Sequence, residues 1–195
     1  LAHKADAVEA AVAAAKAHIE ASPLRGIFER GKPEQTIVWQ EGEITCKARP
    51  DWLTDDRDVL IHVKSTKGSA NPEAWGRTQL EAMGYDMTAA FYERGIAHAL
   101  HTGAPPQSLF LVIEQTAPQG CSLVGMNPLM WQIAAGKVNR AISTWQRCRR
   151  DNQYPGYPTG ITYAEPRNWQ VEEAMDRGDL ESLSFEERIE LGSQA

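Results

Sequence analysis

The chain has 195 residues with a formal net charge of -6 at pH 7, and 42% of the residues are hydrophobic. A chain of this length can bury a sizeable core, so we expect residues 1–195 to form a single domain. It carries no membrane-length apolar run and no signal segment, which predicts a cytoplasmic protein without a membrane partner. Its acidic balance argues against indiscriminate coating of nucleic acid but does not exclude a nuclease, whose metal site gathers carboxylates.

The cysteines and the first residue add two further expectations. The cysteines Cys46, Cys121 and Cys148 lack the paired spacing of a zinc site or a disulfide framework. We therefore expect reduced thiols. The chain begins at Leu1 rather than at a methionine, so we expect some N-terminal residues of the domain to be missing.

The first third of the chain predicts one helix followed by strands. Residues 6–21 are alanine-rich with apolar positions at helical spacing, whereas residues 34–40 alternate as in a strand. Residues 43–53 and 59–65 are β-like runs on either side of an acidic turn at 54–58. We interpret these two runs as an antiparallel hairpin.

The rest of the chain alternates helices with strands. Pro72 begins a predicted helix that reaches about residue 94, with Gly84 as a break or close-packing point inside it. The most apolar segment, 108–114, predicts a central strand, and further elements are a strand at 121–125, a helix at 129–151 and an acidic helical tail from about 170. This order predicts an α/β fold with a mixed central sheet flanked by helices.

The predicted hairpin, KARPDWLTDDRDVLIHVKSTK, gathers the polar groups Asp51, His62 and Lys64. Because side chains alternate along a strand, His62 and Lys64 share one face, and Asp51 can approach it from the other strand. An acid can anchor a divalent cation that activates water, and a lysine can stabilise the charge of a phosphodiester transition state. An ordinary surface pair is the alternative interpretation of the same residues.

The motifs EQTIVW, KARPDWL, VLIHVKST, GYDMTAAFYERG and LFLVIEQTAP occur in this order along the chain. In order and spacing they resemble the nuclease domain of the RecE exonucleases (exodeoxyribonuclease VIII), members of the PD-(D/E)XK superfamily related to λ exonuclease. The resemblance implies a restriction-endonuclease-like core and a Mg²⁺-dependent 5′ to 3′ exonuclease acting on double-stranded DNA ends. It also implies a ring-shaped homo-oligomer that works beside a single-strand annealing recombinase, in a bacterial host and of phage or prophage origin.

The same resemblance assigns roles to individual residues. Asp51 and the main-chain carbonyl of Val63 would be metal ligands, Lys64 the catalytic lysine, and Glu34 an acidic residue at the edge of the site. Tyr85 matches a helix motif that borders the site. Residues that could contact DNA are Arg49, Ser65, Thr66, Tyr85 and Thr88, although Arg49 could equally form a structural salt bridge and Ser65 and Thr66 a turn.

Two positions depart from the family's pattern. His62 stands where the family has its second metal-binding carboxylate, and Thr88 stands where it commonly has glutamine. An imidazole can ligate Mn²⁺ but is a poor ligand for Mg²⁺, so His62 should weaken metal binding. Asp58 lies too far along the turn to replace the missing carboxylate, whereas Glu114, at the end of its strand, is a possible replacement.

Three functional hypotheses stay open at this point. The chain could be an active nuclease with an altered metal site, with Mg²⁺ or Mn²⁺ as cofactor. It could instead be a catalytically inactive DNA-end-binding or assembly protein with the same fold. The third hypothesis is an unrelated α/β interaction domain. The basic residues of the helix at 129–151 could track a DNA backbone or serve only as a solvated helix face.

Overall fold

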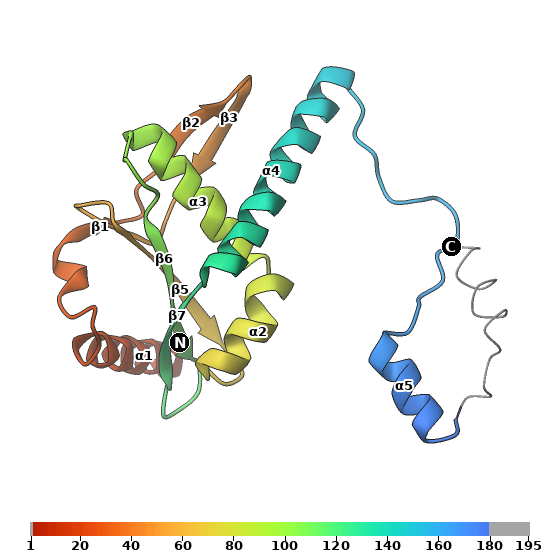
Figure 1. Ribbon diagram of the computed structural model, residues 1–195. Helices are drawn as coiled ribbons and strands as arrows, with labels where there is room; N and C mark the ends of the chain where they lie inside the picture. Colours follow the sequence, from red (N-terminus) through yellow and green to blue (C-terminus); the bar gives the residue numbers. More distant parts are fainter. Residues whose placement is uncertain (1, 180–195) are drawn as a thin grey trace. The chain divides into compact units, whose positions relative to one another are not determined.

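A computed structural model describes residues 2–179 of the chain. It separates into two units, residues 1–153 and residues 154–195. The first unit contains α1 (Ala2–Glu20), the 3-10 helix η1 (Ile27–Glu29), β1 (Gly31–Pro33), β2 (Ile37–Glu41), β3 (Ile44–Ala48), β4 (Trp52–Thr54), β5 (Val59–Thr66), α2 (Pro72–Ala82), α3 (Tyr85–Leu100), β6 (Gln107–Glu114), β7 (Cys121–Gly125) and α4 (Pro128–Asp151) (Figure 1). The second contains α5 (Asn168–Asp176). That residues 1–195 form a single domain stays a prediction.

The centre of the first unit is a five-stranded sheet in the order β1-β4-β5-β6-β7. Strands β5 and β6 are parallel, and the other neighbouring pairs are antiparallel. The predicted α/β class with a mixed sheet flanked by helices is therefore confirmed. Strands β2 and β3 form a separate two-stranded sheet.

Alternation along the central strands assigns each face of the sheet to different helices. Ile61 and Leu111 pack with Ala15 and Ile19 of α1, on one side of the ribbon in Figure 1. On the opposite face, Phe110 and the residues around it pack against α2 and α3. Helix α4 lies against α3 through Ala90, Ala134 and Val138. The even-numbered residues of β5 and β6 therefore face α3, and His62 and Lys64, two of the predicted site residues, lie on this side.

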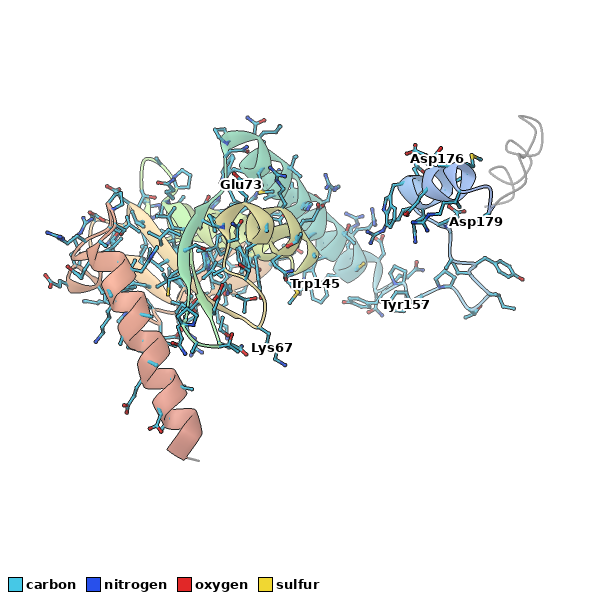
Figure 2. The ribbon with its side chains drawn as sticks, turned by 90° about the horizontal axis from the view of Figure 1, so that it is seen from below. Lys67, Glu73, Trp145, Tyr157, Asp176 and Asp179 are labelled. Atoms are coloured by element: carbon cyan, nitrogen blue, oxygen red, sulfur yellow. The ribbon has the colours of Figure 1, made fainter. Side chains whose placement is uncertain are left out.

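Figure 2 shows the same ribbon from below with its side chains, and it marks Lys67 in the loop after β5 and Glu73 in the first turn of α2. No helix within residues 2–179 combines the length and apolar character that a membrane span requires. In the second unit the predicted tail helix is present as α5, with Asp176 at its end and Asp179 just beyond it (Figure 2). The part of the predicted tail from residue 180 onward lies outside the described residues.

The predicted hairpin of residues 43–53 with 59–65 is wrong in its first half. β3 pairs with β2, from Ile37 opposite Ala48 to Glu41 opposite Ile44, and only Trp52 and Leu53 of β4 pair with β5. Two residues favour the observed pairing. Gly42 adopts a φ of +61° in the turn between β2 and β3, which favours glycine, and Pro50 cannot donate a ladder hydrogen bond.

The predicted helix of residues 72–94 is two helices. Gly84, at a φ of +64°, separates α2 from α3, and α3 continues to Leu100. A left-handed glycine is a common helix terminator, so Gly84 ends the first helix rather than sitting within it. The consequence is that Tyr85 begins α3 beside Phe110 of β6 and Lys64 of β5.

The two-stranded sheet is held to α3 by Trp39 and Glu41. The Trp39 indole N–H donates to the Glu41 carboxylate at 3.0 Å, and the Arg94 guanidinium donates to the same carboxylate at 2.7 Å. Arg94 is the main cause of the lowered pKa of Glu41. The ring of Trp39 lies directly against Gly95, where a Cβ atom would come within 2.5 Å of ring carbons.

We predict that Gly95→Ala destabilises the protein by about 1–3 kcal/mol, because the added methyl group overpacks this contact. Gly136→Ala in α4 is the matched control, since the nearest atom to a Cβ there is the tip of Arg140 at 3.5 Å. That substitution should be neutral or stabilising by up to about 1 kcal/mol through helix propensity. Urea unfolding of both variants checks the prediction, and equal effects would contradict it.

Candidate active site

Asp51 lies beside an edge of β5 that no neighbouring strand covers. Strand β4 pairs with β5 only through Trp52 and Leu53, which lie opposite Ile61 and Leu60. Val63, two residues beyond Ile61, therefore has no strand partner on that side. Instead, its backbone N–H donates to Asp51 Oδ2 at 2.7 Å. The Asp51 carboxylate is therefore fixed next to the residue that precedes Lys64.

Aromatic side chains support Lys64. Its Nζ lies 4.8 Å from the centroid of the Tyr85 ring, a favourable cation–π distance. Tyr85 in turn stacks on Trp75 of α2, with ring centroids 5.9 Å apart and an interplanar angle of 16°. Lys64 is half-buried, so both its charge and its direction are constrained by the start of α3.

His62 lies on the same face of β5 but deeper, with only 2% of its surface exposed. Its ring stacks on Phe110 at 4.9 Å and contacts Tyr92 at 5.7 Å. Its Nε2 is 3.3 Å from Ser108 Oγ. Burial lowers the pKa of His62 from 6.5 to about 4, with a further decrease from the charge of Lys64 and an opposing effect of Asp51. The imidazole is therefore neutral at pH 7.

Glu34 and Arg49 pair with each other at the border of this site. Arg49 Nε is 2.9 Å from Glu34 Oε2, and both side chains are more than half exposed. The Glu34 backbone N–H donates to the Asp51 carbonyl at 3.3 Å, which ties the pair to the site through the main chain. Exposed ion pairs contribute little stability, so Arg49 could exchange this partner for a phosphate at small cost.

The remaining predicted polar residues have local partners. Ser65 Oγ accepts from Gln115 at 3.0 Å, Thr66 Oγ1 accepts from the Gly68 N–H at 3.1 Å, and Thr88 Oγ1 donates to the Gly84 carbonyl at 3.0 Å. Glu114, the possible replacement carboxylate, accepts from the Ala70 N–H at 2.7 Å and lies beside Thr66 in the sheet. It therefore fixes the loop before α2.

Two basic residues of α4 hold the helix in place. Lys137 Nζ lies 2.8 Å from buried Asp86 and 3.0 Å from Glu81, which joins α4 to α3 and α2. Arg149 donates to the Glu43 carbonyl at 3.3 Å. These contacts favour the structural interpretation of Lys137 and Arg149 over DNA tracking, while Arg140 and Arg147 are exposed.

Sequence reasoning missed Glu93 and Ser108, which lie behind His62. Glu93 is only 3% exposed, and its Oε1 accepts from the Ser108 N–H at 3.0 Å. The available signal was that Glu93 follows Ala90 by one helical turn, which places a charge at the edge of the apolar stripe of α3. Its partners on β6 and α4 are distant in sequence and gave no signal.

The donors at this site fit some divalent cations better than others. Asp51 offers a carboxylate, Val63 a carbonyl and His62 a neutral imidazole, so the set carries a single negative charge. Within residues 2–179, no cluster of three or more His, Cys, Asp or Glu side chains could hold a metal ion. A carbonyl, a carboxylate and an imidazole completed by water fit Mn²⁺ and fit Mg²⁺ poorly.

A mixed sheet with Asp51 held beside the strand that carries Lys64 is the arrangement expected of a PD-(D/E)XK-type domain. Residues 3–166 match the model of the family described as "PDDEXK-like domain of unknown function (DUF3799)". The chain therefore belongs to this family, and its fold is of the restriction-endonuclease type, as predicted. No curated protein matches the chain.

Two solved structures are similar to the chain. One is from Eubacterium rectale and is described as a "putative exonuclease"; it has 13% identity and a TM-score of 0.53, and the match covers 81% of this chain and 62% of that one. The other, SSO0001, has 13% identity and a TM-score of 0.38, with coverage of 84% and 65%. The chain thus spans less than two thirds of the length of either neighbour. The first likeness supports the fold alone.

The buried imidazole predicts a pH dependence of stability. The unfolded chain protonates His62 near pH 6.5, whereas the folded protein resists protonation down to about pH 4. Acidification through this window therefore favours unfolding, by roughly 3 kcal/mol at most. The contribution of neutral His62 to the free energy of unfolding is fully present above pH 6.5 and is lost as the pH falls toward 4.

Urea unfolding between pH 7.5 and pH 4 checks this, with His62→Gln as the non-titrating control. The control should lose less stability than the wild type across the same range, because other acidic and basic groups are common to both. Parallel curves would mean that His62 protonates as readily in the folded protein as in the unfolded chain.

Proposed function

We propose that the chain is a metal-dependent nuclease that hydrolyses DNA phosphodiester bonds. The observation that carries this proposal is the hydrogen bond from Val63 N–H to Asp51, which sets a carboxylate beside Lys64 on an exposed strand edge. Membership in a PDDEXK-like family supports it, and the Eubacterium rectale neighbour, which is described as an exonuclease, shares the fold.

In this proposal Asp51, the Val63 carbonyl and His62 would hold a divalent cation, which would supply Lewis acidity at the scissile phosphate. Lys64 carries its positive charge to the phosphate oxygens, where charge increases in the transition state. Tyr85 keeps the Lys64 ammonium directed at the site through its ring face. Arg49 can bind an adjacent phosphate after leaving Glu34.

The finer proposal follows the resemblance to the RecE exonucleases. It assigns 5′ to 3′ exonuclease activity on double-stranded DNA ends, within phage-type recombination. The partners proposed are a single-strand annealing recombinase and further copies of the same chain in a ring. The family match and the fold support the nuclease class, whereas polarity and partners rest on the resemblance.

A second candidate is a protein of the same fold that binds DNA ends without cleaving them. The observation that favours it is the buried, neutral His62 at the position where the resembling nucleases have a carboxylate. With Asp51 as its one carboxylate, the site attracts a hard cation weakly.

We predict that the full chain degrades linear duplex DNA with Mn²⁺ and at least about tenfold more slowly with Mg²⁺, because an imidazole is a better ligand for Mn²⁺. Lys64→Ala and Asp51→Asn should each lower the rate by about 10²-fold or more. Release of labelled nucleotides from duplexes labelled at the 5′ or the 3′ end measures both rate and polarity. Covalently closed circular DNA is the control substrate.

The substitution His62→Asp separates the two candidates. If the wild type cleaves with Mn²⁺, His62→Asp should shift the preference toward Mg²⁺. If only His62→Asp cleaves and the wild type merely binds duplex ends, the second candidate replaces the first. Absence of both cleavage and duplex binding in both proteins would refute both candidates.

A further inference from the structure

Strands β2 and β3 form a two-stranded ribbon whose two faces differ in character. The inward residues of both strands are buried and pack against Ile96 of α3. The outward residues are exposed, and cross-strand pairing sets Val38 opposite Lys47. Gln40 lies opposite Thr45 on the same side. We call these four residues the outer face of the ribbon.

The outer face carries positive charge and no acidic side chain, although the whole chain has a net charge of -6. Glu41, the acid of β2, points inward, where its carboxylate accepts from Trp39 and Arg94. Gln40 donates to Thr45 Oγ1 at 3.0 Å. Among the described residues no carboxylate forms an ion pair with Lys47, so its ammonium group is available to an anion from outside.

The outer face leads along the chain into the candidate active site. Ala48 and Pro50 are buried, and the residues between and before them, Arg49 and Lys47, are exposed. A residue before proline favours extended backbone, so alternation places Lys47 and Arg49 on one side, about 6.5 Å apart. Asp51, which accepts from the Val63 N–H, follows two residues later. Lys47 and Arg49 thus form a basic row that ends beside the candidate site.

We infer that this basic row binds neighbouring phosphates of the DNA strand whose scissile phosphate is held beside Asp51. The inference rests on the proposed function and names the surface that positions its substrate. An interval of about 6.5 Å is on the scale of the separation between successive phosphates along one strand. A cationic face in an otherwise acidic chain also attracts a polyanion to this place rather than elsewhere. Contacts to the phosphate backbone position a strand without reading its sequence.

Glu34 competes with DNA for Arg49. Arg49 Nε lies 2.9 Å from Glu34 Oε2, and both side chains are more than half exposed, so an exchange of partner costs little. Glu34→Gln should therefore tighten the binding of duplex DNA by about two- to fivefold. Most of this gain should disappear when Arg49→Ala is also present. An equal gain with and without Arg49 would remove Arg49 from the basic row.

The salt dependence of DNA binding tests the row directly. Fluorescence anisotropy of a labelled linear duplex, with EDTA present to prevent cleavage, gives the affinity of the full chain at several salt concentrations. Lys47→Ala should reduce the slope of log affinity against log salt by about 0.9, and the double variant with Arg49→Ala by about 1.8. The reduction should be the same for duplexes of different sequence. Lys47→Arg keeps the charge and should keep the slope.

Lys16→Ala is the matched control. Lys16 is an exposed lysine of α1, the helix that packs on the face of the central sheet opposite α3. Its loss removes the same charge but should leave the slope unchanged. Thermal unfolding checks that each variant is folded. Equal slopes in Lys47→Ala and the wild type, equal reductions in Lys47→Ala and Lys16→Ala, or absence of duplex binding by the wild type would overturn the inference.

Release of nucleotides by the wild type with Mn²⁺ or Mg²⁺ reports the proposed function separately. If the wild type degrades DNA but its salt slope does not depend on Lys47, the nuclease stands and the inference fails. If the slope depends on Lys47 but neither metal supports cleavage, the nuclease proposal fails. The basic row would then serve the candidate that binds DNA ends without cleaving them.

Discussion

The hydrogen bond between Val63 N–H and Asp51 is the interaction on which the candidate site depends. It exists because β4 is short. Pro50 cannot donate to a ladder, so strand pairing stops at Trp52 and leaves the Val63 N–H open. A side chain then takes the place of a strand, and a carboxylate comes to lie one residue from Lys64. Longer pairing of β4 would satisfy the backbone but would remove the acid from this position.

The face of β5 that packs on α3 raises a different question, namely how a polar group is kept inside the sheet–helix interface. Burial of His62 costs little because the imidazole is neutral, stacks between aromatic rings and has a hydrogen-bond partner. Glu93 remains buried for a similar reason, since N–H donors satisfy both of its oxygens.

The features predictable from the sequence were those with local causes. Strand β6 follows from a continuous apolar run, and α4 from Asn127, whose side chain caps the helix by accepting from the Met130 N–H at 2.8 Å. The prediction that residues 43–53 pair with β5 was wrong because β2 and β5 are both possible partners for β3, and strand order is a non-local property. The positions of Asp51 and Lys64 could be inferred from a motif, whereas Glu93 and Ser108 are brought to His62 only by the tertiary fold.

The imidazole at position 62 alters the charge that the proposed metal site can offer. Asp51 is held beside the residue that precedes Lys64, and it is the carboxylate of the proposed donor set. His62 is neutral at pH 7 because burial lowers its pKa to about 4. A cation in the proposed site would therefore meet one negative charge and one neutral nitrogen. Such a site would discriminate by ligand softness more than by charge, which is the physical basis for the proposed preference for Mn²⁺ over Mg²⁺.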